Sequence, residues 1–250
     1  MAKQSGIIKL KGTIGGVSFY KSQDGYLARE KGGVERERIM SDPAFARTRE
    51  NGQEFGTAGK AVKFLTSAFR PVILSAADGR VTSRLIAQML KVVQSDAVHE
   101  RGQRTVADGD LAILKGFEFN NRSKLSSTLY APFTHAVNRV DGEITVNIPA
   151  FVPRNGIVAP AGTTHFSITV VGCELDFVNA TFIQNIQQTA ILPYDSVEGA
   201  ATELTVALSP ASTQPMFLVM GIQFYQNVNN VKYPLKNGSF NAVQLIEVDY

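Results

Sequence analysis

Hydrophobic residues recur at steps of three and four in two segments of the N-terminal half. The first segment follows Asp42 and Pro43, a pair suited to the N-cap and first turn of a helix, and Pro71 ends it. Its apolar positions are Phe55, Ala58, Val62, Leu65 and Phe69. The second segment runs from Asp78 to about Gln94, and its apolar positions are Val81, Leu85, Met89 and Val92. Both patterns predict amphipathic helices that bury one face.

Residues 6–31 alternate with a period near two, which is typical of strands. The runs "GVSFYK" and "YLARE" flank "SQDG", in which Asp24-Gly25 is a strong turn signal. The glycines of "GTIGG" resemble part of a phosphate-binding loop. Such a loop, however, needs a Lys-Ser/Thr pair that opens a helix, and here the glycines precede a strand pattern. The segment therefore predicts a hairpin.

From about residue 110 the alternation of two dominates. It predicts strands near 111–119, 124–131, 133–139, 143–149, 164–172, 174–183, 186–192, 203–208, 216–226, 230–234 and 240–249. Asp141-Gly142 and Asn237-Gly238 are turn signals between such runs. The predicted fold class is α+β, with an N-terminal β-hairpin and two helices beside a C-terminal immunoglobulin-like antiparallel β-sandwich. The expected regions are 1–106 and 107–250, with the boundary in "RGQRTVADGD".

The charges divide the chain of 250 residues into a basic and an acidic part. Residues 1–106 hold 18 Lys and Arg against 10 Asp and Glu, a net charge of +8. Residues 107–250 hold 7 against 12, a net charge of −5. A basic region favours anionic partners, and opposite signs along one chain favour head-to-tail association of copies.

Chemistry-bearing residues form no recognisable catalytic or metal-binding motif. The histidines His99, His135 and His165 lie far apart in sequence and lack metal-ligand spacing. Cys173 has apolar neighbours and no local base, which predicts a buried structural thiol. A site assembled from dispersed residues stays open, but we expect a protein that is not an enzyme and has no cofactor and no metal.

Glycines at positions 52, 56 and 59 share a second stripe of the first predicted helix. Each glycine costs a helix about 1 kcal/mol relative to alanine. Gly52, Gly56 and Gly59 therefore either let another backbone approach closely or mark a break near Gly52 between two shorter helices.

Two long segments, 177–194 and 204–231, contain no Asp, Glu, Lys or Arg. Exposed strands of a soluble monomer usually carry charge, and protein interfaces are depleted in Lys, Glu and Asp. These strands are therefore covered either by the rest of the chain or by another subunit.

The N-terminal third resembles an uncharacterised bacterial family of unknown function. The resemblance rests on "GIIKLKGTIGGVSFYKSQDGYLAREKGG" followed by "DPAFARTRENGQEFGTAGKAVKFLTSAFRP". It implies a glycine-rich hairpin, a helix and a strand-rich tail. The family has no assigned activity, so the resemblance implies no catalytic residue.

These patterns favour a structural subunit that self-assembles into a filament, tube or similar homopolymer through strand addition and charge-free β surfaces. The expected contacts are Ile7, Ile8 and Leu10 near one end, Val243, Leu245 and Ile246 near the other, and the three glycines. The alternative is a binding module, either an adhesin-like sandwich for a glycan or protein, or a nucleic-acid binder through the basic N-terminal half. With neither a secretory signal nor a membrane span in the sequence, we expect synthesis in the cytoplasm. The final location, including release as an assembled particle, stays open.

Overall fold

The computed structural model describes residues 2–30, 32–76, 78–235 and 240–250. It divides into two compact units, Met1–Arg49 and Glu50–Tyr250, with the boundary inside one helix. The expected boundary at 101–110 differs from this division. The reason is that the predicted helices share a hydrophobic core with the strands that follow them.

The described residues of the first unit form a small antiparallel sheet in the order β1-β4-β3-β2. Its strands are β1 (Ala2–Lys3), β2 (Gly12–Ile14), β3 (Val17–Ser22) and β4 (Gly25–Glu30). The expected hairpin is confirmed, since β3 pairs with β4 and the closing pair is Ser22 with Gly25. Gly25 has φ of +107°, a conformation that favours glycine.

Helical segments follow this sheet. They are α1 (Arg36–Ser41), the 3-10 turn η1 (Pro43–Phe45) and α2 (Ala46–Ala68). The side chain of Asp42 accepts a hydrogen bond from the backbone N–H of Ala44, so it caps η1 as the sequence predicts. Helix α2 runs through Gly52 without a break, which excludes the alternative of two shorter helices.

The second unit holds the remaining helices and strands. The helices and 3-10 turns are α3 (Arg70–Ile73), α4 (Val81–Ser95), η2 (Leu111–Leu114), α5 (Leu125–Thr128) and α6 (Pro153–Gly156). The strands are β5 (Thr134–Asn138), β6 (Glu143–Ile148), β7 (His165–Asp176), β8 (Thr181–Gln188), β9 (Leu192–Pro193), β10 (Thr202–Ala207), β11 (Met216–Val228), β12 (Val231–Pro234) and β13 (Ala242–Asp249).

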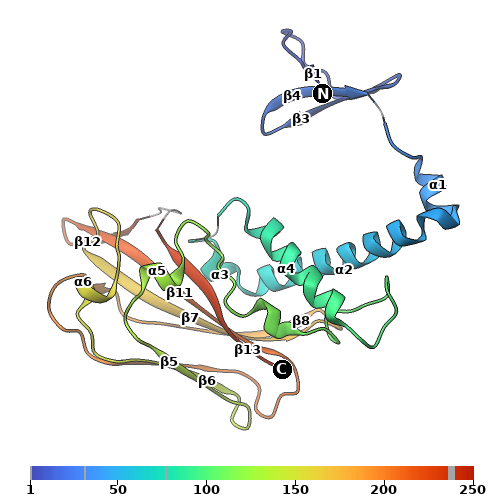
Figure 1. Ribbon diagram of the computed structural model, residues 1–250. Coiled ribbons are helices and arrows are strands. Elements are labelled where there is room, and N and C mark those ends of the chain that lie inside the picture. The colour runs from blue at the N-terminus through green and yellow to red at the C-terminus, as the bar shows by residue number, and fades with distance from the viewer. Residues whose placement is uncertain (1, 31, 77, 236–239) are drawn as a thin grey trace. The chain divides into compact units, whose positions relative to one another are not determined.

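These strands build two antiparallel sheets. Among the described residues, β11 pairs with β7 on one side and with β12 and β13 on the other, and β7 also pairs with β8 and β9. The smaller sheet has the order β10-β6-β5. Helices α2 and α4 cover one face of the larger sheet, and the smaller sheet lies against its other face (Figure 1).

The larger sheet is the middle layer, which explains its composition. Alternate residues of β7 and β11 belong to different cores: Val171 and Phe217 pack with the helices, while Val170 and Leu218 pack with the smaller sheet. A strand buried on both faces has no position for a charged side chain. Residues 216–225 of β11 therefore lack charge because the chain itself covers them, whereas residues 226–228 are exposed.

The α+β class is confirmed, while the immunoglobulin-like assignment stays a prediction. The predicted second helix corresponds to α4, whose four stripe residues are buried. The predicted strands at 111–119 and 124–131 are wrong where η2 and α5 form instead. Asp110 accepts a hydrogen bond from the Ala112 N–H, and this cap favours a turn over a strand. The predicted Asn237-Gly238 turn lies outside the described residues.

Candidate assembly surfaces

The N-terminal sheet has no core of its own. No residue in the described ranges 2–30 and 32–49 is buried. Pairing places Ile14 opposite Val17, and Phe19 opposite Ala28, on one face of this sheet. Ile14 is 62% exposed. On the same face, Lys21 and Glu30 flank this apolar centre. The opposite face carries Thr13, Ser18 and the Arg29–Tyr20 pair, so the apolar centre lies mainly on one face of the sheet.

A loop projects from this sheet and carries its most exposed apolar side chains. Ile7 is 103% and Ile8 82% exposed, and Leu10 is 41% exposed. The side chain of Gln4 closes the loop, because its Oε1 accepts the backbone N–H of Leu10 at 2.8 Å. Gln4 is itself fixed to the sheet, since its Nε2 donates to the Leu27 carbonyl at 3.0 Å. We use the term loop tip for residues 5–8.

The three glycines of α2 form an open surface. A Cβ atom added at Gly52, Gly56 or Gly59 would meet no other atom within 4 Å. Phe55, which the sequence places in the buried stripe, is 55% exposed beside them. The remaining stripe residues pack into the helical core. The close approach of another backbone, predicted for these glycines, is therefore not made within the described chain.

The C-terminal contact residues are placed differently from the N-terminal ones. Val243 and Leu245 are 1% exposed and Ile246 is 7% exposed. Their strand, β13, pairs with β11 on one side, and on the other side Leu245 exchanges backbone hydrogen bonds with Gly116 and Phe117. The expected strand addition by this segment is therefore corrected, because both edges of β13 are occupied within the chain.

The charge-free segment 177–194 contains an exposed edge strand, β8. The structure pairs β8 only with β7 among the described residues. Its apolar residues Phe182, Ile183 and Ile186 are 41%, 49% and 41% exposed. An unpaired edge without charge is a template for pairing with another chain. Unlike residues 216–225 of β11, this strand has no buried residue.

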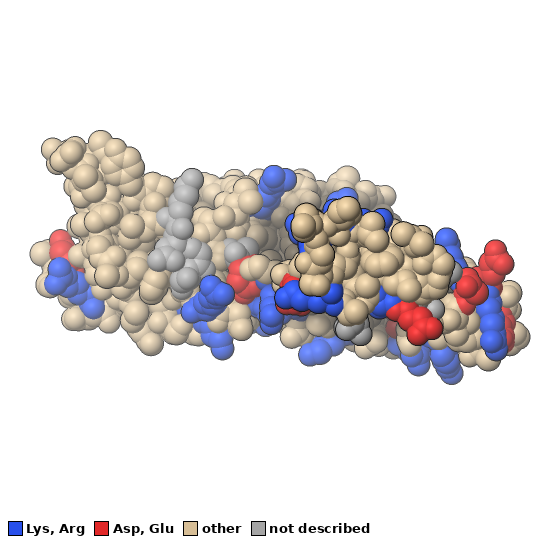
Figure 2. All heavy atoms as spheres, turned by 90° about the horizontal axis from the view of Figure 1, so that it is seen from above, with Lys and Arg blue, Asp and Glu red and all other residues tan. Residues whose placement is uncertain are grey.

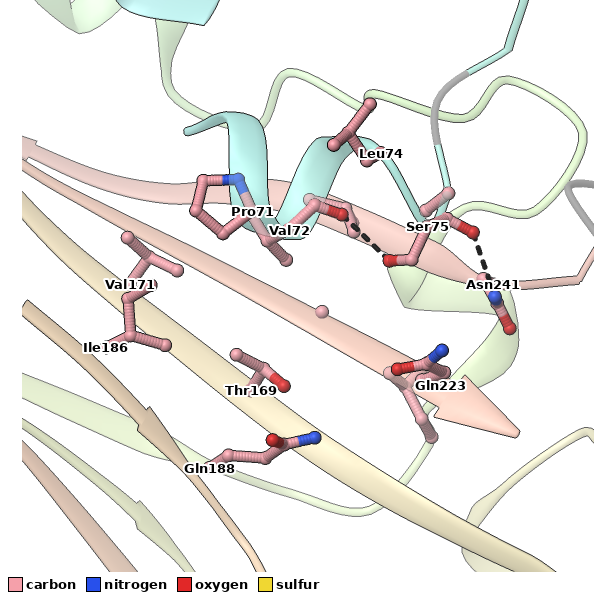
Figure 3. Close-up of a pocket in the computed structure, with 14 residues that line it drawn as sticks. Pro71, Val72, Leu74, Ser75, Thr169, Val171, Ile186, Gln188, Gln223 and Asn241 are labelled. Atoms are coloured by element: carbon pink, nitrogen blue, oxygen red, sulfur yellow. Dashed lines mark hydrogen bonds between the residues drawn. The ribbon is translucent and has the colours of Figure 1, made fainter. Parts of the chain in front are cut away.

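A groove opens where the helical layer ends over the larger sheet (Figure 3). Its volume is about 560 Å³. Pro71 and Val72 of α3 overhang it, and the sheet beneath contributes Thr169, Gln188 and Gln223. No Asp, Glu, Lys, Arg or His is among the described residues that line it.

Hydrogen bonds hold the polar side chains of the groove in place. Gln188 Nε2 donates to the hydroxyl of buried Ser167 at 2.9 Å, and Gln223 Oε1 accepts from the Tyr225 hydroxyl at 3.2 Å. At the far end, Asn241 donates to the Ser75 carbonyl. The groove thus presents neutral amides between apolar walls, an arrangement suited to an uncharged ligand.

The structure brings together one group of acidic and histidine side chains that the sequence did not predict. Asp96, His99 and Asp108 bring ligand atoms within 4.8 Å of one another, the one such group found in the described residues. Asp96 is buried, and its two oxygens already accept the N–H groups of Val98, His99 and Thr105 as well as His99 Nδ1. Burial opposes ionisation of Asp96, but the three backbone donors offset it and lower the pKa of Asp96 well below its ordinary value. A metal ion would have to displace these donors, so the group is a structural turn.

In the described part of the chain, Cys173 and the three histidines lie at separate places. Cys173 is fully buried, as predicted, and burial, with a smaller effect of Glu174, raises the pKa of its thiol to about 12. His135 pairs with Glu247 at 2.7 Å, and the ring of His165 bonds to the hydroxyl of Thr164. The three histidines therefore remain separate.

No helix among the described residues is both long and apolar enough to pass through a bilayer. Comparisons with protein-family models, curated proteins and solved structures found no match. The resemblance of the N-terminal third to an uncharacterised bacterial family therefore stays a prediction.

Proposed function

We propose that this protein is a non-enzymatic structural subunit that self-assembles into a filament, tube or similar homopolymer. The observation that carries the proposal is the N-terminal unit, in which none of the described residues 2–30 and 32–49 is buried. A sheet with an apolar face becomes stable by packing that face against another layer. Wherever this protein is made, a second copy of it is available as such a partner.

The charge distribution supports a partner of the same sequence. Residues 1–49 hold 10 Lys and Arg against 5 Asp and Glu, a net charge of +5, whereas residues 50–250 hold 15 against 17, a net charge of −2. Contacts between unlike parts of two copies are heterologous, and such contacts propagate into filaments unless a rotation closes them into a ring. The loop tip and the exposed edge of β8 are uncharged surfaces that support such a contact.

Light scattering and negative-stain electron microscopy of the full-length protein test this proposal. We expect a large species with regular filaments or tubes. The variant pair Ile7→Asp and Ile8→Asp should remain a monomer of 27.1 kDa with an unchanged circular dichroism spectrum. Val140→Asp is a matched control, because Val140 is 77% exposed and lies outside the N-terminal unit. A full-length monomer over the whole accessible concentration range would refute self-assembly.

Nucleic-acid binding through the basic N-terminal half is the alternative that one observation favours. Aromatic rings and cations alternate on the N-terminal sheet, and such surfaces stack bases. However, Arg29 lies over Tyr20 at 5.6 Å, and Lys21 lies over Tyr26 at 5.6 Å, so the chain's own cations occupy these rings. Large parts of the surface seen in Figure 2 also carry no charged side chain. A binding affinity that falls steeply with salt would favour this alternative.

A further inference from the structure

The groove under α3 has the size and polarity to receive the loop tip of another copy. Its volume of about 560 Å³ lies in the range of clefts that enclose most of a bound ligand. We propose that Ile7 and Ile8 of one subunit seat in this groove of a second subunit. This inference rests on the proposed self-assembly and identifies the surface that receives the loop tip.

The apolar parts of the two surfaces match. Ile7 and Ile8 are the most exposed large hydrophobic residues of the described chain, so burying them removes the largest apolar area from water. The groove offers apolar walls from Val72 and Ile186, and Leu74 at its rim is 73% exposed. Interfaces of this kind depend on a few anchors that fill a pocket on the partner.

The polar parts match as well. The described structure gives the backbone of residues 5–8 no hydrogen-bond partner, so a bound tip needs donors and acceptors from its site. Gln188 uses its Nε2 on Ser167, which leaves its carbonyl oxygen to accept a peptide N–H. Gln223 uses its Oε1 on Tyr225, which leaves its amide N–H groups to donate to a peptide carbonyl. Both glutamines lie on the sheet below α3, on the two strands that flank β7 (Figure 3).

The charges select this groove over the other large cleft of the second unit. Residues 4–8 carry no charge, and neither does the lining of the groove under α3. The other cleft, beside Phe64 and Phe177, is lined by the charged residues Lys60 and Asp108, which the uncharged tip would cover without offering them an ionic partner.

Cross-linking between two different variants tests the contact between copies. Ile8→Cys and Gln188→Cys are purified separately, mixed and oxidised, and a dimer is sought on a non-reducing gel. We expect at least tenfold more dimer than in a mixture of Ile8→Cys with Val140→Cys. The native Cys173 is fully buried and stays out of the reaction. A dimer yield equal to that of the control mixture, in a sample that assembles by light scattering, would overturn the inference but keep the proposed function.

A charge placed in the groove gives a second test. Gln188→Lys should raise the concentration needed for assembly at least tenfold. Gln187→Lys is its matched control, since the neighbouring residue of β8 is also exposed but points to the opposite face. Equal effects of the two variants would exclude the groove as the acceptor. A wild-type protein that does not assemble would remove both the inference and the function on which it rests.

Discussion

The side chain of Gln4 closes a loop by accepting the backbone N–H of Leu10 at 2.8 Å. Ile7 and Ile8 lie at the tip of this loop, and the same glutamine donates to the Leu27 carbonyl of strand β4. One side chain therefore holds two exposed isoleucines in a fixed position relative to the sheet. A contact element that is ordered before binding loses less conformational entropy on binding.

Gln4→Ala should weaken assembly without unfolding the protein. The freed loop would have to be ordered again on binding, at a cost of about 1 kcal/mol, or roughly a fivefold weaker association. The concentration dependence of light scattering measures this change. Gln23→Ala, at an exposed glutamine in the turn between β3 and β4, should leave assembly unchanged. Equal behaviour of the two variants would show that the clamp has no role in assembly.

Substitutions on the glycine face of α2 should affect the stability of the protein and its assembly in opposite directions. Replacing Gly52, Gly56 and Gly59 together by alanine should stabilise the helix by roughly 0.5–1 kcal/mol per residue, because no atom opposes the new Cβ. If another backbone approaches this face in the assembly, the same change should weaken assembly. Thermal unfolding and light scattering measure the two effects, with Lys63→Ala on the same helix as the control. Assembly that matches the wild type would place the contact elsewhere.

Local signals in the sequence were sufficient where neighbouring residues determine an element. The stripe of α4 and the Asp42 cap are examples, because both depend on neighbours within one or two turns. Strand β7 shows the limit. The alternation predicted two strands, 164–172 and 174–183, but β7 runs from His165 to Asp176 through Gly172. The absent side chain admits Val206, whose Cγ2 would lie 2.5 Å from a Cβ at this position.

The candidate surfaces could not be predicted in full, because they depend on contacts between residues that lie far apart in the sequence. The absence of charge in β8 and β11 looks the same in sequence, and only the packing of the larger sheet shows that residues 216–225 of β11 are covered and β8 is not. The groove combines α3 with four strands, β7, β8, β11 and β13, from distant parts of the chain. Both apolar end segments were expected to pair by strand addition. Ile7 and Ile8 lie exposed in a loop, whereas Val243 and Leu245, which are equally apolar, lie in the core.

Asp96 should be one of the most important polar residues for the stability of the second unit. Its two oxygens accept four hydrogen bonds, and the NH2 group of an asparagine would face two of these donors. Asp96→Asn should therefore reduce the free energy of unfolding by about 3 kcal/mol. Urea denaturation measures this loss. Asp108→Asn, at a side chain 43% exposed, should change it by less than about 1 kcal/mol.

Asp96 should also make the free energy of unfolding depend on pH in the acid range. The pKa of Asp96 is lower in the folded than in the unfolded state, so its contribution is complete above the unfolded value near 4. The contribution should decline as the pH falls below that value. Asp96→Asn should remove this part of the acid sensitivity, and an unchanged acid profile of the variant would argue against the assignment.

Glu118 should produce the opposite dependence, at higher pH. Burial raises the pKa of Glu118 to about 7, although the N–H of Leu125 and the charges of Lys124 and Arg84 act against it. Between the unfolded value near 4.3 and pH 7 the folded state therefore holds more protons than the unfolded state. The free energy of unfolding should fall as the pH rises through this range and level off above it.

Glu118→Gln should remove this slope, because glutamine does not titrate. It keeps an oxygen for the Leu125 N–H, which Glu118 accepts at 3.1 Å. At pH 8 the variant should be more stable than the wild type by about 1 kcal/mol, a value reduced for the partial exposure of the carboxylate. Urea denaturation from pH 5 to pH 8 measures the slope, with Glu143→Gln at an exposed position as the control. A slope that is the same in Glu118→Gln and in the wild type would assign the dependence to another group.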